Sequence, residues 1–135
     1  MGVPMMYVWI TVGSAIGGAA RYWCSGFAAN HFGETFPMGT LLVNIIGSFI
    51  IGFFATLTAP DGRFLVRSEM RQFVMTGFCG GYTTFSSFSL QTLNLVRDGE
   101  LARAGVNVML SFTLCLLAVW LGYAAAAFLN QLKGA

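Results

Sequence analysis

The hydrophobic pattern of this chain consists of four long apolar stretches separated by short polar segments. The stretches cover about residues 4–30, 38–59, 72–96 and 104–129. A helix that crosses a bilayer needs about 20 apolar residues, and each stretch is long enough. We therefore predict an all-α integral membrane protein with four transmembrane helices, folded as a single membrane domain over residues 1–135.

The third apolar stretch contains the most unusual pattern in the chain. Residues 77–89 read Gly-Phe-Cys-Gly-Gly-Tyr-Thr-Thr-Phe-Ser-Ser-Phe-Ser, with glycines and hydroxyls where lipid-facing leucines are expected. Irregular backbone at membrane depth is tolerated only where it packs against protein or lines a cavity. We predict that this helix is broken at Gly80-Gly81, with carbonyls turned inward at an ion or solute site.

Beyond these glycines, polar residues form a stripe at helical spacing beside two phenylalanines. The stripe consists of Thr84, Ser87, Gln91 and Asn94, and the phenylalanines are Phe85 and Phe88. An aromatic ring has a positive edge, so rings flanked by hydroxyls can meet an anion where a full positive charge would trap it. Without the hydroxyls, two phenylalanines at this spacing would be ordinary core or lipid contacts.

Isolated polar side chains in the other stretches each have a functional and a structural interpretation. Asn44 can donate its amide to an anion, or it can bond to a neighbouring helix. Ser111 can line the same path, or it can bond to its own backbone. Arg21 is more typical of a structural anchor near a span end than of a direct ion contact.

Composition agrees with a membrane protein and excludes several function classes. Hydrophobic residues make up 56% of the chain and charged residues 9%, whereas a soluble domain carries about 25% charged residues. The net charge is +2, without a basic cluster that would indicate nucleic-acid binding. No Lys or Arg precedes the first stretch, so we expect no signal peptide.

Missing residue types and the cysteines narrow the choice further. No stretch contains Asp or Glu, so a proton-coupled antiporter would lack its membrane carboxylate. No His, Asp and Glu cluster indicates a metal enzyme, and no nucleophile motif is present, so we expect no enzymatic activity. We interpret Cys24, Cys79 and Cys115 as small buried hydrophobes rather than a disulfide framework or metal site.

Basic residues near the ends of the stretches give only a weak orientation signal. One side carries Arg63, Arg67, Arg71 and Lys133, and the other carries Arg97 and Arg103, with Arg21 inside the first stretch. Since Lys and Arg near span ends set orientation, two readings stay open. Either the chain inserts both ways and forms an antiparallel homodimer, or it prefers the orientation with the 63–71 loop inside.

The motifs resemble those of the CrcB/Fluc family of fluoride channels. The run at 77–89 is similar to the family signature. Residues 39–47, Gly-Thr-Leu-Leu-Val-Asn-Ile-Ile-Gly, resemble its second-span motif, and residues 17–21, Gly-Gly-Ala-Ala-Arg, resemble the end of its first span. The resemblance implies an antiparallel dual-topology homodimer in the prokaryotic inner membrane. It further implies two pores for passive fluoride efflux, which would protect the cytoplasm.

The resemblance also assigns expected roles to individual residues. It implies a fluoride pore lined by Asn44, Phe85, Phe88 and Ser111, next to the hydroxyls of Thr84 and Ser87. Arg21 matches a vestibule arginine. Backbone carbonyls of Gly80 and Thr83 match the ligands of a structural Na⁺ ion at the dimer interface. Cys115 lies one turn beyond Ser111, where a hydroxyl would serve the pore better.

Two rival functions stay open from the residues alone. A small proton-coupled multidrug exporter can also be a four-span dual-topology dimer, and the missing membrane carboxylate argues against it. A membrane subunit without transport activity is the other rival, and the polar stripes argue against it.

Overall fold

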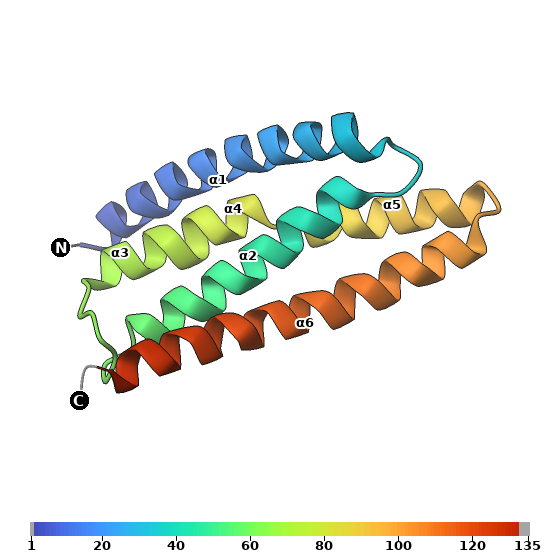
Figure 1. Ribbon diagram of the computed structural model, residues 1–135. Coiled ribbons are helices and arrows are strands. Elements are labelled where there is room, and N and C mark those ends of the chain that lie inside the picture. The colour runs from blue at the N-terminus through green and yellow to red at the C-terminus, as the bar shows by residue number, and fades with distance from the viewer. Residues whose placement is uncertain (1, 133–135) are drawn as a thin grey trace.

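The computed structural model describes residues 2–132, and all regular structure in that range is helical (Figure 1). Lys133, counted above in the charge bias, lies outside the described residues. The elements in chain order are α1 (Val3–Phe32), α2 (Met38–Leu57), α3 (Ser68–Gln72), the π-helical η1 (Phe73–Cys79), α4 (Gly80–Tyr82), α5 (Phe85–Arg97) and α6 (Leu101–Gln131).

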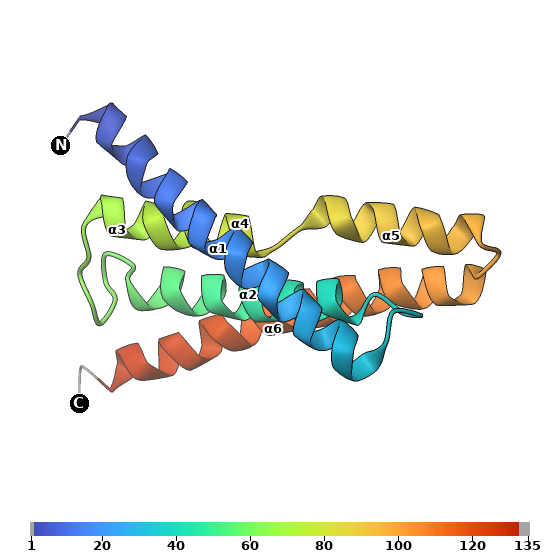
Figure 2. The same ribbon diagram turned by 90° about the horizontal axis from the view of Figure 1, so that it is seen from above.

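Three of these helices, α1, α2 and α6, are long and apolar enough to cross a membrane, with mean hydropathies of 1.4, 2.1 and 2.1. The segments from α3 to α5 follow one another in a line and form a fourth, interrupted element (Figure 2). The predicted all-α architecture, with an interruption in the third apolar stretch of the sequence, is therefore confirmed.

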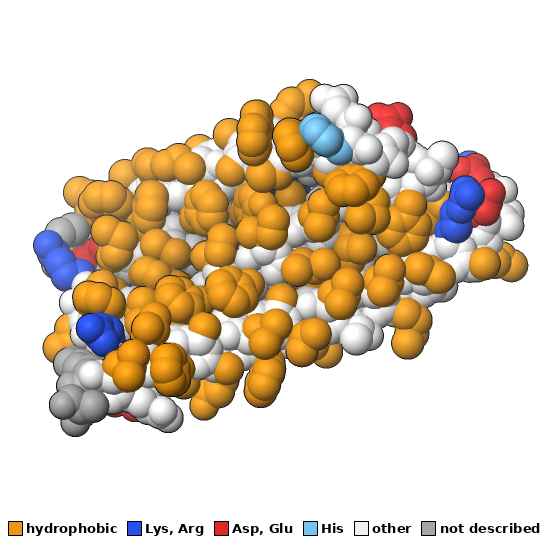
Figure 3. Space-filling model, viewed as in Figure 1, with side chains coloured by type: hydrophobic (Ala, Val, Ile, Leu, Met, Phe, Trp, Pro, Cys, Tyr) orange, Lys and Arg blue, Asp and Glu red, His pale blue; other side chains and the backbone are white. Residues whose placement is uncertain are grey.

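The surface of the molecule matches a lipid environment. Large apolar side chains point outward along the helices, for example Trp23 at 68% exposure and Leu116 at 66%. Figure 3 shows hydrophobic side chains over the middle of one face, with charged side chains gathered towards the two ends. Charged groups avoid the hydrocarbon region, so this distribution indicates that the helices cross the bilayer from end to end.

Glycines bring the helices into close contact. A methyl group added at Gly13 or Gly17 of α1 would overlap the backbone of η1 or α4, and one added at Gly122 of α6 would overlap the backbone of α2 at Phe49. Small residues permit such close approach, which drives helix association in lipid. As a result, α1 crosses over the interrupted element, and α2 packs along α6 (Figures 1 and 2).

Two arginines anchor this end of the molecule, Arg63 in the loop between α2 and α3 and Arg71 in α3. The Arg71 guanidinium donates to the Thr58 carbonyl (2.6 Å) at the end of α2. The Arg63 amide donates to Asn130 Oδ1 (2.7 Å), and the Arg63 guanidinium donates to the Leu129 carbonyl (3.1 Å) near the end of α6. Cations at helix C-termini stabilise unpaired carbonyls, so Arg71 ties α3 to the end of α2, and Arg63 ties the loop to the end of α6.

The predicted position of the helix break at Gly80-Gly81 is wrong. Gly80 is helical, with φ −63° and ψ −37°, whereas Thr83 (φ −83°, ψ 159°) and Thr84 (φ −154°, ψ 109°) are extended. The Cα of Gly81 instead faces the backbone of Ser14 in α1, where a methyl group would overlap it. This glycine therefore serves helix packing, and the helix ends one residue later, at Tyr82.

Candidate functional site

A cavity of about 330 Å³ lies at the helix break, between the interrupted element, α2 and α6. Five of the six residues predicted for the pore line it, together with Gly80 and Thr83; the five are Asn44, Thr84, Phe85, Phe88 and Ser111. The chain thus brings side chains from three elements, up to 67 positions apart between Asn44 and Ser111, to a single cavity.

Asn44 holds the extended backbone at the break. Its Nδ2 donates to the Thr84 carbonyl (3.1 Å), and its Oδ1 accepts from the Thr84 amide (2.8 Å). One side chain therefore pairs with both backbone polar groups of Thr84. Unpaired backbone groups at membrane depth cost several kcal/mol each, about 2–7 kcal/mol by transfer scales, so Asn44 makes the break tolerable.

Thr84 also caps the helix that follows the break. Its Oγ1 accepts from the Ser87 amide (3.1 Å), which is the usual bond of an N-cap threonine. The same oxygen bonds to the hydroxyls of Ser87 (3.1 Å) and Ser86 (3.2 Å). Ser87 does not line the cavity, so its hydroxyl reaches the site only through this cap.

These side-chain bonds leave two backbone carbonyls without their helical donors. In a continuous helix the Thr84 amide would donate to the Gly80 carbonyl, and the Ser87 amide would donate to the Thr83 carbonyl. Here those amides donate to Asn44 and to the Thr84 side chain instead. Carbonyls at the end of a half-helix carry partial negative charge, so the break offers a cation two oxygen ligands.

The two predicted phenylalanines differ in their surroundings. Their ring centroids are 5.3 Å apart, with planes tilted by 53°. Phe88 is 7% exposed and meets the ring of Phe112 edge to face, at 6.1 Å and 85°. Phe85 is 69% exposed and stands at the open side of the cavity.

The sequence pattern did not single out Phe112, which also lines the cavity. It stands in an apolar stretch next to Ser111, and a single phenylalanine among apolar residues carries no periodic signal. Its position beside a candidate pore serine was the only available indication.

Several other polar residues lie elsewhere. Arg21 is half-buried on α1 and is not part of the cavity lining. Asn107 is 1% exposed and donates to Thr92 Oγ1 (2.9 Å), which makes it a link between α6 and α5. Gln91 and Asn94 line a second, more polar cavity of about 530 Å³ near the turn between α5 and α6.

The fold and the site together define a class of protein. It is a multi-pass α-helical membrane protein whose interrupted helix opens onto a cavity lined by amide, hydroxyl and aromatic groups. Irregular backbone that lines a cavity at membrane depth is typical of channels and transporters.

The chain belongs to the CrcB family, as its sequence motifs predicted. The sequence model of the family described as CrcB-like protein, Camphor Resistance (CrcB), matches residues 8–123 of the chain. The chain is 64% identical to the fluoride-specific ion channel FluC of Opitutus terrae, over 96% of this chain and 98% of the relative. It is 61% identical to the protein of the same name from Methylocella silvestris, over 97% of this chain and 100% of the relative.

We expect Thr84→Ala to destabilise the protein by about 1 kcal/mol, because a lost N-cap typically costs about 0.5–2 kcal/mol. Thr84→Ser keeps the capping oxygen and should unfold close to the parent. The measurement is thermal unfolding in detergent, followed by tryptophan fluorescence. Equal midpoints for the Ala and Ser variants would show that the cap contributes nothing.

Proposed function

We propose that this protein is a fluoride-selective channel that gives passive fluoride efflux across the cell inner membrane and so protects the cytoplasm from fluoride toxicity. The observation that carries the proposal is the lining of the cavity at the helix break. The amide of Asn44 and the hydroxyl of Ser111 line it together with the rings of Phe85 and Phe88. Full-length relatives with the name fluoride-specific ion channel support the same function.

The chemistry of the lining suits a small, strongly hydrated anion. A pore must replace the water around the ion without binding it too tightly for release. Amide and hydroxyl groups donate hydrogen bonds without fixed charge, and ring edges add a weak positive potential. The described residues that line the cavity include no acidic side chain to repel an anion and no basic one to hold it.

The main alternative, a proton-coupled multidrug exporter, has less support. Coupling to protons in the membrane requires an ionisable group in or beside the path, and the cavity lining as described has no carboxylate. Channel conduction requires no reacting group, so the proposed function includes no enzymatic step.

The first test is ion flux from liposomes that contain the purified protein. We expect rapid fluoride efflux that needs no proton gradient, with chloride efflux near the level of protein-free liposomes. Fluoride release is measured with a fluoride-selective electrode, and chloride release is measured with a chloride electrode on matched vesicles. Robust chloride flux, or fluoride flux that stops when the proton gradient is removed, would falsify the proposal.

The second test concerns the rings. Phe85→Ile and Phe88→Ile keep apolar bulk but remove the aromatic edge, so fluoride flux should fall by about tenfold or more, equivalent to a barrier increase of about 1.4 kcal/mol. Phe128→Ile is the matched control, because Phe128 is 61% exposed on α6 and does not line the cavity. If folded Phe85 and Phe88 variants conduct like the control, both rings serve packing only.

We further propose that two chains assemble as an antiparallel homodimer. The cavity is open to the surface of one chain, where the ring of Phe85 and the backbone of Gly80 are exposed. A second copy would cover them, and the weak Lys/Arg bias permits insertion in both orientations. C-terminal tags should then be accessible on both sides of the membrane in comparable amounts. Labelling of nearly all chains on one side would contradict this assembly.

The same assembly would create a sodium site. The carbonyls of Gly80 and Thr83 lack their helical donors, and two copies would supply four such oxygens, which are suitable ligands for Na⁺ as a structural ion. Binding to the folded state raises its stability by mass action, by about 2.7 kcal/mol when the ion is at 100 times its dissociation constant. Replacing Na⁺ by N-methylglucamine at constant ionic strength should therefore lower the unfolding temperature. An unchanged temperature would rule out the ion.

A further inference from the structure

Three phenylalanine rings from two helices form a continuous series at the cavity of the helix break. Phe85 and Phe88 belong to α5 and Phe112 belongs to α6, and all three line the cavity. The ring centroid of Phe88 lies 5.3 Å from that of Phe85 and 6.1 Å from that of Phe112. Both distances fall within the range of interacting aromatic pairs, about 4.5–7 Å. Phe88 is therefore the ring that joins the other two.

Phe88 is also the most enclosed of the three rings. Its side chain is buried, whereas Phe112 is 52% exposed and Phe85 is still more open. The planes of Phe88 and Phe112 are nearly perpendicular, at 85°. An edge-to-face contact is one of the preferred geometries of two aromatic rings. The contact with Phe112 therefore favours one orientation of the Phe88 ring plane.

The backbone of Phe88 is linked to α6 as well. The Thr92 hydroxyl, one turn further along α5, donates to the Phe88 carbonyl (2.7 Å). The Asn107 side chain of α6 donates in turn to the Thr92 oxygen (2.9 Å), and Asn107 is almost fully buried. Hydrogen bonds of this kind hold neighbouring helices together in membranes. Helix α6 thus holds Phe88 at two levels, through the ring and through the carbonyl.

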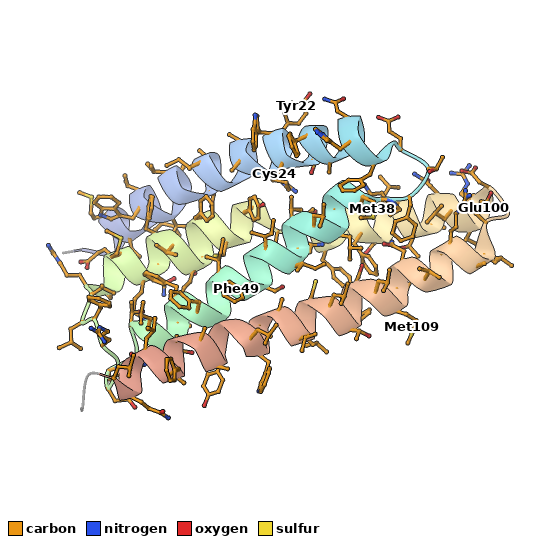
Figure 4. All side chains as sticks on the ribbon, viewed as in Figure 1. Tyr22, Cys24, Met38, Phe49, Glu100 and Met109 are labelled. Atoms are coloured by element: carbon orange, nitrogen blue, oxygen red, sulfur yellow. The ribbon has the colours of Figure 1, made fainter. Side chains whose placement is uncertain are left out.

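A short turn brings these partners opposite each other. Helix α5 ends at Arg97 and α6 begins at Leu101. Glu100 marks the turn, from which the two helices run back side by side (Figures 2 and 4). Phe88 and Phe112 lie at similar distances from this turn along their helices, so the connection itself sets their contact.

The orientation of the Phe88 ring decides the sign of the potential that it presents to the cavity. An aromatic ring is negative over its face and positive at its edge. A ring that turns by a right angle about its Cβ–Cγ bond therefore presents its face where its edge had been. The χ2 torsion of phenylalanine has broad minima, so a neighbouring group has to hold the ring in the orientation that attracts an anion.

We propose that Phe112 is a positioning residue, which holds the Phe88 ring with its edge towards the anion path. The inference rests on the proposed channel function, and it assigns to Phe112 an action on Phe88 rather than on the ion. Leucine at position 112 fills a similar space but offers no aromatic face or edge to Phe88. Tyrosine at the same position keeps the ring.

The test measures fluoride efflux from liposomes that contain the parent, Phe112→Leu, Phe112→Tyr or the control Phe128→Leu. Phe128 is also on α6, is 61% exposed and does not line the cavity. We expect flux through Phe112→Leu to fall about fivefold, equivalent to about 1 kcal/mol in the barrier. Phe112→Tyr should recover most of the parent flux. Because Phe112 is half-exposed, both variants should fold, which size-exclusion chromatography checks.

A double-mutant cycle distinguishes positioning from a direct role in the pore. With Phe88→Ile already present, Phe112→Leu should cause no further loss, because the ring that it positions is gone. With Phe85→Ile present, Phe112→Leu should still lower the flux about fivefold. The protein-to-lipid ratio is raised until every variant conducts above protein-free liposomes. The inference is overturned by an additional loss in the Phe88→Ile background, or by a Phe112→Leu flux equal to that of the control.

The motion of the Phe88 ring separates this inference from the channel proposal. Its flip rate is measured by aromatic carbon NMR in detergent, with the Phe88 signal assigned by its loss in Phe88→Ile. We expect faster flips in Phe112→Leu and the parent rate in Phe128→Leu. This result in a protein that does not conduct fluoride would retain Phe112 as the residue that holds the ring and refute the channel function. A parent flip rate in Phe112→Leu would overturn the inference even where the protein conducts fluoride.

Discussion

The structure depends on how one interrupted helix satisfies its backbone where no water is available. The bilayer forces every polar backbone group to find a partner within the protein. At Thr84 that partner is a side chain of another helix, because the amide of Asn44 bonds to both the N–H and the C=O. Without this pair, the N–H and C=O of Thr84 would be unpaired at membrane depth, at a cost of several kcal/mol each. Asn44 thus supports the site as well as lining it.

Close helix contacts make that arrangement rigid. Glycines on α1 allow its backbone to lie directly against η1 and α4, and glycines on α2 and α6 do the same for the second helix pair. The backbone before the break is therefore fixed against α1, while the backbone after it is fixed by the cap of Thr84. The side chains between these anchors, including Phe85 and Phe88, are positioned by neighbours on both sides rather than by a flexible loop.

The three long apolar helices and the interrupted element between α2 and α6 could be predicted from the sequence, because the length of each apolar stretch is set by the bilayer. The polar and aromatic residues Asn44, Thr84, Phe85, Phe88 and Ser111 of the cavity were predictable too, since amides, hydroxyls and paired rings stand out in an apolar background. The position of the break was not, because Gly81 can mark either a weak helix or a close contact, and only the neighbouring Ser14 distinguishes them. Phe112 escaped prediction because nothing in the sequence shows which side of α6 faces Phe88.

The two hydrogen bonds from the Asn44 side chain to the backbone of Thr84 have an evolutionary consequence. Among the side chains, only Asn and Gln carry an N–H donor and a carbonyl acceptor on one planar group, and Gln is longer by a methylene. Aspartate keeps the acceptor without the donor, and aliphatic residues keep neither. No other side chain at position 44 keeps both hydrogen bonds with the same geometry. Position 84 contributes its backbone to the pair, so its side chain is free to vary as far as its capping role allows. Drift in this region should leave the residue at position 44 nearly invariant, while the side chain of its bonding partner at position 84 tolerates more exchange.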